Sequence, residues 1–289
     1  MLIEFKFSNI LSYKDENKLL MTPVKSFKEH AQTHIFKTER GIDLLKTAAI
    51  YGSNGGGKSN FIAAMGLMKK VIHNSFSESL KKEEDRDNNN DYFFKLSNRT
   101  ESLPSSVEVS FIGEENVLYR YGFEIKGYKI IKEWLYQKID IETLLFERDL
   151  NGFKINSKSF SEGNKYKENV NSNVLFLSHL AQNNTKVSTK IFNWFRKLNV
   201  VSGLNDRHYK NVTKELLKKV PKFRAWLSIA VKFLEISNIN TSKDDKIITY
   251  HNKFDDDDVI IDTVAFDFDR EESQGTKKII YLLGAVYDT

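Results

Sequence analysis

The residues from Gly52 to Ser59 combine glycine, lysine and serine in a spacing that can hold phosphate groups. They read Gly-Ser-Asn-Gly-Gly-Gly-Lys-Ser and satisfy the pattern G-x-x-x-x-G-K-[ST]. The glycines permit positive φ and place no Cβ in front of a phosphate, so successive backbone N–H groups can point to one anion. Lys58 would supply a positive charge to the β- and γ-phosphates, and the hydroxyl of Ser59 would be a ligand of Mg²⁺.

This loop predicts a site for a nucleoside triphosphate, and we expect ATP and Mg²⁺ as its ligands. The residues expected to bind the nucleotide are Asn54, Gly55, Gly56, Gly57, Lys58, Ser59 and Asn60. The flanking sequence agrees, since Lys46–Tyr51 is a short apolar run typical of a buried strand and Ser59–Val71 has apolar residues at helical spacing. A strand, a glycine loop and a helix in this order would direct the positive end of the helix dipole at the phosphates.

A second group of residues, Glu272-Ser-Gln-Gly-Thr-Lys277, stands at the start of the last predicted helix, Gly275–Val286. Ser273 and the backbone around Gly275 and Thr276 would face an anion there, because a serine hydroxyl and the positive end of a helix both attract negative charge. The same residues also make an ordinary helix N-cap, in which the serine only accepts a backbone N–H. The residues alone leave both interpretations open.

The phosphate loop resembles that of one class of ATPases. Gly52–Asn60 is similar to the form G-x-N-G-x-G-K-S-N of ATP-binding-cassette ATPases, specifically of the clade that includes SMC and RecF proteins. The opening is similar too: Asn9-Ile-Leu-Ser-Tyr13 resembles a segment of the form N-F-x-S-F, with tyrosine in the last place and leucine where arginine is common. The resemblance implies an α/β head of the cassette type that binds ATP.

The same resemblance implies roles for two later segments. Ser273, Gly275 and Thr276 would form the signature motif, which in cassette ATPases contacts the γ-phosphate held by the other subunit. Gln182, in the segment Phe176–Asn184, would be a second ligand of Mg²⁺ that reports the γ-phosphate to the arm. Both roles come from the family pattern.

Further short motifs occur in one order along nearly the whole chain: Leu2-Ile-Glu-Phe5, Glu133-Trp-Leu-Tyr136, Leu145-Phe-Glu-Arg148, Leu180-Ala-Gln182, Trp194-Phe195 and Glu272–Thr276. In this order they resemble the AAA-type cassette ATPases of bacterial anti-phage and abortive-infection loci, namely the RloA-like, PtuA-like and PARIS-type ATPases. The resemblance implies an ATP-dependent homodimer or higher oligomer. It also implies that the assembly senses infection and controls an effector protein encoded nearby, a nuclease or a toxin.

The sequence departs from the cassette pattern after the signature. Cassette ATPases carry a Walker B strand, four apolar residues followed by Asp-Glu, whose Asp completes the Mg²⁺ shell and whose Glu orients the attacking water. The chain reaches Thr289 without such a segment, and Val259-Ile-Ile-Asp262 precedes the signature and lacks the glutamate. The catalytic residues therefore stay unknown. We expect residues 1–289 to be the N-terminal portion of a longer protein, and to bind ATP·Mg²⁺ while hydrolysing it negligibly.

The predicted fold class is α/β: a P-loop NTPase of the cassette type with an inserted antiparallel β lobe and a helical arm. Val107–Phe153 reads as successive strands with Gly or Asn turns, and helical spacing marks Val187–Leu198 and Pro221–Ile236. We expect four parts: 1–75, the head with the phosphate loop; 76–175, the β lobe with exposed loops at 77–91 and 157–173; 176–245, the arm; and 246–289, the return to the head with strands at 246–251 and 259–268 and the signature.

Composition limits the classes of function. Apolar residues make up 40% and charged residues 29%, and no apolar run approaches the ~18–20 residues that cross a bilayer. We therefore expect a globular, cytoplasmic protein without a membrane partner. Cysteine is absent, which excludes disulfides and thiolate metal sites. The formal net charge of +5 permits a nucleic-acid partner, although the lysines are scattered among acidic residues rather than clustered.

Three other functions fit parts of the sequence. An SMC/RecF-like ATPase of DNA repair would carry long heptad coiled coils or a basic DNA-binding lobe, and no sustained heptads are present. A small-molecule kinase would need a catalytic acid and a lid with arginines, and arginine is sparse. A bound nucleotide could also serve the fold alone. The trigger, the effector and the stoichiometry do not follow from the sequence.

Overall fold

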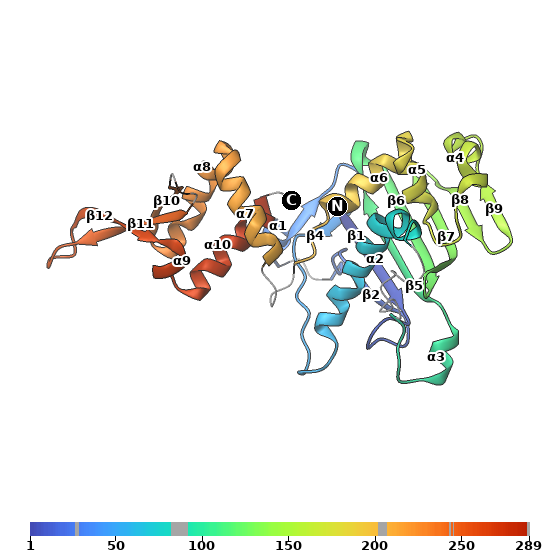
Figure 1. Cartoon of the computed structure of the whole chain (residues 1–289), viewed down its shortest axis with the longest axis horizontal. Coiled ribbons are helices and arrows are strands. Elements are labelled where there is room, and N and C mark those ends of the chain that lie inside the picture. Colours follow the sequence, from blue (N-terminus) through green and yellow to red (C-terminus); the bar gives the residue numbers. More distant parts are fainter. Residues whose placement is uncertain (27–28, 82–91, 202–206, 243, 245, 288–289) are drawn as a thin grey trace. The chain divides into compact units, whose positions relative to one another are not determined.

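The structure, a computed structural model, describes residues 1–26, 29–81, 92–201, 207–242, 244 and 246–287. The chain divides into two compact units, Met1–Arg196 and Lys197–Thr289, and each is described by itself. The described residues form a mixed α/β fold with a large antiparallel sheet and ten α helices (Figure 1). This confirms the predicted α/β class. No helix in the described ranges has both the length and the apolar character that a membrane span requires.

The first unit is built on a seven-stranded antiparallel sheet in the order β2-β1-β5-β6-β7-β8-β9. The strands are β1 Leu2–Ser8, β2 Asn17–Leu20, β5 Ser105–Ile112, β6 Leu118–Lys126, β7 Lys129–Lys138, β8 Glu142–Asp149 and β9 Gly152–Ile155. Side chains at alternate positions are buried on one face. The register places Phe5 opposite Val109, and Val109 opposite Tyr121, so large apolar side chains form rows across that face. The sheet confirms the antiparallel region predicted between residues 107 and 153.

Helices cover the buried face of this sheet. They are α2 Lys58–Ser79, α5 Phe176–Gln182 and α6 Lys186–Lys197 (Figure 1). In α2, the ring of Phe61 packs edge-on against Phe7 of β1, with centroids 5.0 Å apart. In α6, Trp194 stacks on Phe111 of β5 at 3.9 Å. The helices predicted after the phosphate loop and around Trp194 are thereby confirmed.

Shorter elements connect these: α1 Ala31–His34, β3 Ile35–Lys37, β4 Asp43–Leu45, α3 Asn98–Ser102, α4 Ser161–Tyr166 and 3-10 turns at Glu114–Asn116 and Lys167–Asn169. The loop predicted at 157–173 therefore contains a helix. A charged side chain orders this polar segment, because Glu162 accepts the backbone N–H groups of Val187 and Ser188. Of the loop predicted at 77–91, residues 77–79 end α2, and residues 82–91 lie outside the described residues.

The apolar run Lys46–Tyr51 is not a buried strand, and the prediction for it is wrong. Its residues are exposed, with Tyr51 91% accessible, and no strand is assigned to them. A strand needs a neighbouring strand to pair its backbone groups. In the described part of the chain, no strand of the large sheet pairs with this run. Apolar composition alone could not report whether a partner strand is present.

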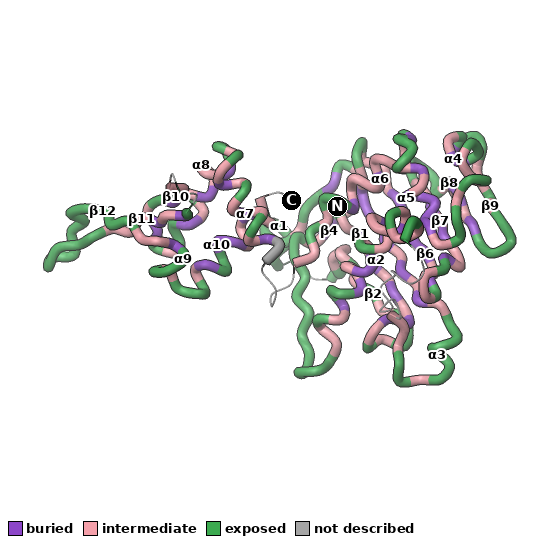
Figure 2. The backbone as a smooth tube through the Cα atoms, viewed as in Figure 1, coloured by how far each residue is buried: buried purple, intermediate pink, exposed green. Residues whose placement is uncertain are grey.

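The second unit combines helices with a three-stranded antiparallel sheet in the order β10-β11-β12. Its elements are α7 Arg207–Lys219, α8 Pro221–Ala230, a 3-10 turn Val231–Leu234, β10 Ile236–Thr241, β11 Ile247–Phe254, β12 Ile260–Asp267, α9 Phe268–Glu271 and α10 Gln274–Tyr287. Its buried core includes Phe223, Leu227, Ile239, Phe268 and Ile280, whereas most of β12 is exposed (Figure 2). The helix predicted over Pro221–Ile236 is confirmed as α8 only as far as Ala230, since a 3-10 turn and the start of β10 follow it. The predictions for β11, β12 and α10 are confirmed, whereas no bounds were predicted for α7 and β10 was not predicted.

The two units cut across the four parts expected from the sequence. β1 and β5 are paired neighbours, so residues 1–75 and 76–175 contribute to one sheet. The boundary between the units follows Arg196, inside the segment 176–245 that was expected to form one arm. Strand pairing between segments far apart in sequence, which no local pattern reports, accounts for the difference.

Candidate functional site

The backbone of residues 52–59 forms a turn that leads directly into α2. Gly55 and Gly57 have left-handed φ values of 78° and 86°, which glycine adopts without a steric cost. The N–H of Gly56 donates to the carbonyl oxygen of Ser53 at 3.1 Å, and Gly57 caps the N-terminus of α2. The first N–H groups of a helix have no partner within it, and with the helix dipole they attract an anion to this end of α2.

Lys58 and Ser59 occupy the first positions of α2. The ammonium of Lys58 donates to the carbonyl oxygens of Gly52 and Ser53, each at 2.8 Å, so its charge is held over the loop. Residues 54–60 line an open depression of about 310 Å³. At Gly55 a Cβ would meet no atom within 4 Å, so this side of the loop is open to a ligand. Backbone donors, one cation and the Ser59 hydroxyl fit the phosphates of a nucleotide and its Mg²⁺.

The N-terminal segment reaches this loop, which sequence reasoning did not specify. Tyr13 Oη donates to the carbonyl oxygen of Gly57 at 3.1 Å, and Asn60 Nδ2 donates to Ser12 Oγ at 3.0 Å. The Tyr13 ring packs on Phe7 of β1, with centroids 5.0 Å apart. The segment Asn9–Tyr13 can be recognised in the sequence, but its contact with the phosphate loop cannot, because 44 positions separate Tyr13 from Gly57. Ser12 and Tyr13 therefore brace the loop against β1.

Asn9 fixes where this segment leaves β1. Its buried Nδ2 donates to the carbonyl oxygens of Thr100 at 2.9 Å and Leu103 at 3.0 Å, and its Oδ1 accepts the N–H of Phe94 at 3.0 Å. Its φ of 53° is left-handed, a conformation in which asparagine is enriched. Asn9 is thus an anchor that sets the position of Ser12 without touching the phosphate loop itself.

The second candidate group lies at the N-terminus of α10. Ser273 Oγ accepts the N–H of Thr276 at 3.0 Å and lies 2.8 Å from its hydroxyl, so Ser273 is the N-cap of this helix. At Gly275 an added Cβ would come no closer than 3.7 Å to any atom, the nearest being Ser273 Oγ. The fold therefore does not require glycine there, although glycine inside a helix costs about 1 kcal/mol relative to alanine. A glycine at position 275 would be explained if another molecule approaches the backbone closely there.

Glu272 ties the start of α10 to the three-stranded sheet. Its Oε1 accepts the hydroxyl of Thr249 at 2.5 Å and lies 2.7 Å from Nε2 of His251. The Glu272 side chain is only 7% exposed, so these bonds are sheltered from water. Sequence reasoning missed both partners, because neither a threonine nor a single histidine in a strand forms a pattern.

The chain matches one known family over most of its length. Residues 48–289 match the family described as "AAA domain, putative AbiEii toxin, Type IV TA system". The chain belongs to this family. No curated protein matches it. The matched range includes both the phosphate loop and the α10 N-terminus, and an AAA domain is a P-loop ATPase domain, so the family supports nucleotide binding at Gly52–Ser59.

In this AAA-domain chain, Gln182 lies apart from the phosphate loop. Gln182 is exposed at the C-terminal end of α5. This helix runs antiparallel to α2, because the N–H of Leu175, the N-cap of α5, donates to Ser75 Oγ, and Ser178 Oγ donates to the carbonyl oxygen of Ile72 at 2.6 Å. A helix rises about 1.5 Å per residue, so Ile72 lies roughly 20 Å along α2 from Ser59. Gln182 is four residues beyond Ser178 and is therefore only about 6 Å closer to Ser59 than Ile72 is. The structure does not bring Gln182 to Ser59, and its role as a metal ligand stays a prediction.

Among the described residues, no group of three or more His, Asp or Glu side chains lies close enough together to hold a metal ion. The phosphate loop offers the Ser59 hydroxyl instead, which suits a Mg²⁺ that is also bound by phosphate oxygens. The acid that would orient an attacking water is not identified by these contacts, and the catalytic residues stay unknown.

Gly57→Ala is expected to weaken nucleotide binding by about tenfold or more, which corresponds to about 1.4 kcal/mol. Alanine is strained at a φ of 86°, and its Cβ would come within 2.8 Å of Ser12 Oγ, so Ser12 would have to move away from Asn60. Calorimetry measures the affinity. The control Gly41→Ala has the same strain, at a φ of 71°, but its Cβ meets no atom within 4 Å. Equal affinities in both variants would show that the loop conformation does not matter.

Proposed function

We propose that this chain is an ATP-binding subunit of the ATP-binding-cassette type in a bacterial anti-phage defence system, where it senses infection. It binds ATP·Mg²⁺ at Gly52–Ser59 and, with ATP bound, associates into a homodimer or a larger assembly. Through that assembly it controls an effector protein, a nuclease or toxin. The observation that carries the proposal is the phosphate loop, with left-handed glycines, an inward Lys58 and a helix N-terminus, in a family whose description names the AbiEii toxin.

Features at the N-terminus of α10 support ATP-dependent association. Ser273 and Gly275 are exposed, and the first N–H groups of α10 carry the positive end of a helix dipole. A phosphate bound by one copy could be reached by this terminus of another copy, and a glycine would let the two backbones approach closely. The N-cap role of Ser273 is compatible with this: when Thr276 is the donor in the hydroxyl–hydroxyl contact, the Ser273 oxygen accepts and its own proton is free to be donated.

Ser273→Arg is expected to abolish ATP-driven association while leaving the ATP affinity of the single chain unchanged. The arginine side chain would occupy the space in front of α10 that the proposal reserves for a neighbour's phosphate. Light scattering with and without ATP·Mg²⁺ measures association, and calorimetry measures affinity. Loss of the N-cap should itself cost only about 1 kcal/mol of stability.

Two variants separate the cap from the interface. Ser273→Thr keeps a hydroxyl that can cap α10 and should still associate, whereas Ser273→Ala removes the hydroxyl without adding bulk and should associate weakly. If Ser273→Arg associates with ATP as the wild type does, the N-terminus of α10 is not part of the assembly. Nucleotide binding at the phosphate loop would be unaffected by that result.

A further inference from the structure

In the second unit, β11 extends past the end of its neighbour β10. Ile236, the first residue of β10, pairs with His251, and β11 continues from there to Phe254. Residues 252–254 pair with β12 on one side only. Among the described residues, no strand lies along the other side of this stretch, which leaves a short free edge. A free strand edge offers unpaired backbone donors and acceptors to another chain.

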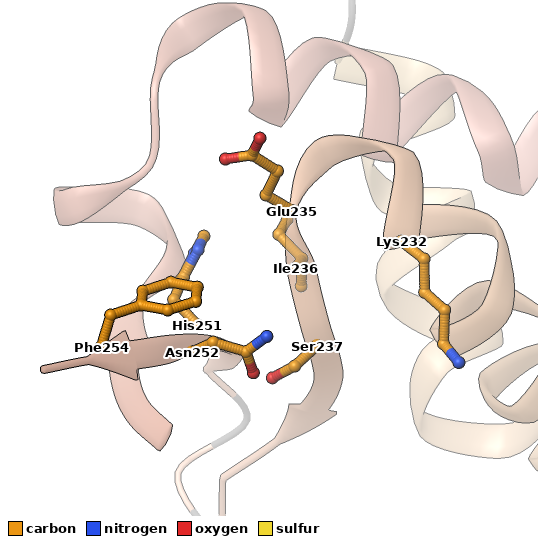
Figure 3. A pocket seen from close by; sticks show the side chains of 7 residues that line it. All are labelled: Lys232, Glu235, Ile236, Ser237, His251, Asn252 and Phe254. Carbon is orange, nitrogen blue, oxygen red and sulfur yellow. The ribbon is translucent and has the colours of Figure 1, made fainter. Parts of the chain in front are cut away.

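A cavity of about 610 Å³ opens beside this edge. Its walls include the start of β10, with Ile236 and Ser237, and the end of β11, with His251, Asn252 and Phe254 (Figure 3). Ile236 is buried and Phe254 is 52% exposed, and these two residues supply the apolar part of a lining that is otherwise polar. We call the free edge of 252–254 together with this cavity the β11 ledge.

Charge around the β11 ledge is negative. Phe254 is followed directly by four aspartates, Asp255–Asp258, and Glu235 lines the cavity. The same segments contain two lysines, Lys232 and Lys253. These segments therefore carry five carboxylates and two ammonium groups. Asp255 is used by the turn, since its Oδ1 accepts the N–H groups of Asp257 and Val259. The excess negative charge would repel a nucleic acid and attract a basic partner.

Exposed apolar side chains continue along the neighbouring strand. Val259, Ile260 and Ile261 are 57%, 57% and 56% exposed, next to the acidic turn. Natural sheets usually protect such edges with lysines, prolines or short strands. Here one of the three free edge positions carries a lysine, Lys253, but the turn that follows is acidic and the apolar residues of β12 are bare, a combination typical of a surface that receives a partner.

We propose that the β11 ledge binds an extended peptide segment of a partner protein in which apolar and basic residues alternate. The segment would add a strand in line with β10 and pair with the free edge of β11. Because side chains of a strand alternate between its faces, one set would enter the cavity against Ile236 and Phe254, and the other would meet the carboxylates of the acidic turn. This inference goes beyond the proposed ATPase function and does not depend on nucleotide.

The test uses the whole chain and a fluorescein-labelled synthetic peptide that alternates lysine and valine. Its length of about seven residues, typical of a strand, covers the free positions 252–254 and leaves residues that reach the acidic turn. Fluorescence anisotropy should show saturable binding that weakens as salt is raised. Phe254→Ala should weaken binding by about tenfold, because the buried contact with one large side chain is lost. Asp256→Asn combined with Asp257→Asn should also weaken it and flatten the salt dependence.

A matched control removes two exposed acids from the first unit: Asp140→Asn with Glu168→Gln should bind like the wild type. A peptide that alternates glutamate and valine should not bind, and a lysine–valine peptide with methylated backbone nitrogens should bind much more weakly. Equal binding of the methylated peptide, equal effects of the control variant, or preference for a single-stranded RNA over the lysine–valine peptide would each overturn the proposal, as would no binding at all. Circular dichroism checks that each variant is folded.

Discussion

Lys58→Ala is expected to lower ATP affinity by at least about 100-fold, because hydrogen bonds from a charged group are worth about 1.5–3 kcal/mol each and 1.4 kcal/mol is a factor of ten. In the structure the ammonium already lies over the loop, bonded to the carbonyl oxygens of Gly52 and Ser53. Phosphate oxygens bring negative charge that those neutral carbonyls lack, so a lysine here favours the bound state. Calorimetry measures the affinity, and circular dichroism should show an unchanged fold.

The control for this variant is Lys46→Ala. Lys46 is exposed in the segment that leads to the loop, so its removal changes the net charge equally without removing a group from the loop. Cells that carry the whole gene give a second measurement: plaque counts for Lys58→Ala should match those of cells without the gene. If Lys58→Ala binds ATP as tightly as the wild type does, the proposed function loses its basis. If the variant loses ATP affinity but gives the same plaque counts as the wild type, nucleotide binding stands and only the proposed defence role is wrong.

The phosphate loop could be predicted because its geometry is local. The left-handed positions at Gly55 and Gly57 and the helix that starts at Lys58 follow from residue types within a few positions of one another. The hairpins of the large sheet were predictable for the same reason, since alternating residues and short turns specify neighbouring strands. The N-cap at Ser273 belongs to this class too, and its further role stays a prediction.

Long-range partners could not be predicted. Nothing near Lys46–Tyr51 shows that the run lacks a neighbouring strand, and nothing near Tyr13 shows that its hydroxyl meets Gly57. The place of Gln182 depends on how α5 lies along α2, which two hydrogen bonds between distant segments decide. Glu133 is the strongest case, because a glutamate in a strand is usually read as solvent-facing and this one is fully buried.

The Glu133 carboxylate joins the sheet to α5. Oε1 accepts the hydroxyl of Tyr121 at 2.9 Å and the N–H of Leu177 at 3.0 Å; Oε2 accepts the N–H of Phe176 at 2.7 Å. Oε2 also lies 2.9 Å from Arg148 Nε, an ion pair in which the Nε–H is not aligned as a hydrogen bond, while Arg148 Nη2 donates to a backbone carbonyl. Burial, and then the Glu133 charge, raise the pKa of Tyr121 well above its ordinary value, so its hydroxyl remains a donor.

Glu133→Ala is expected to destabilise the first unit by about 3–5 kcal/mol, because removing one partner of a buried ion pair leaves the other charge uncompensated. The Arg148 guanidinium would remain buried, and two N–H groups at the start of α5 would lose their acceptor. Since whole domains are stable by only about 5–15 kcal/mol, this variant should unfold at much lower urea concentration. Urea unfolding followed by circular dichroism measures the change, and amide exchange should show α5 opening first.

Glu147→Ala provides the contrast on the neighbouring strand. Glu147 pairs with Lys132 at 2.8 Å, but the two side chains are 28% and 40% exposed, and such pairs contribute less than about 1 kcal/mol. Its unfolding midpoint should therefore stay close to that of the wild type. Adding Arg148→Met to Glu133→Ala should recover part of the loss, because the uncompensated charge is then gone, although the α5 N–H groups and the Tyr121 hydroxyl still lack an acceptor and the carbonyl oxygen of Val174 has lost its donor. If the double variant is no more stable than Glu133→Ala, the buried charge is not the source of the destabilisation, and the lost acceptor for α5 is.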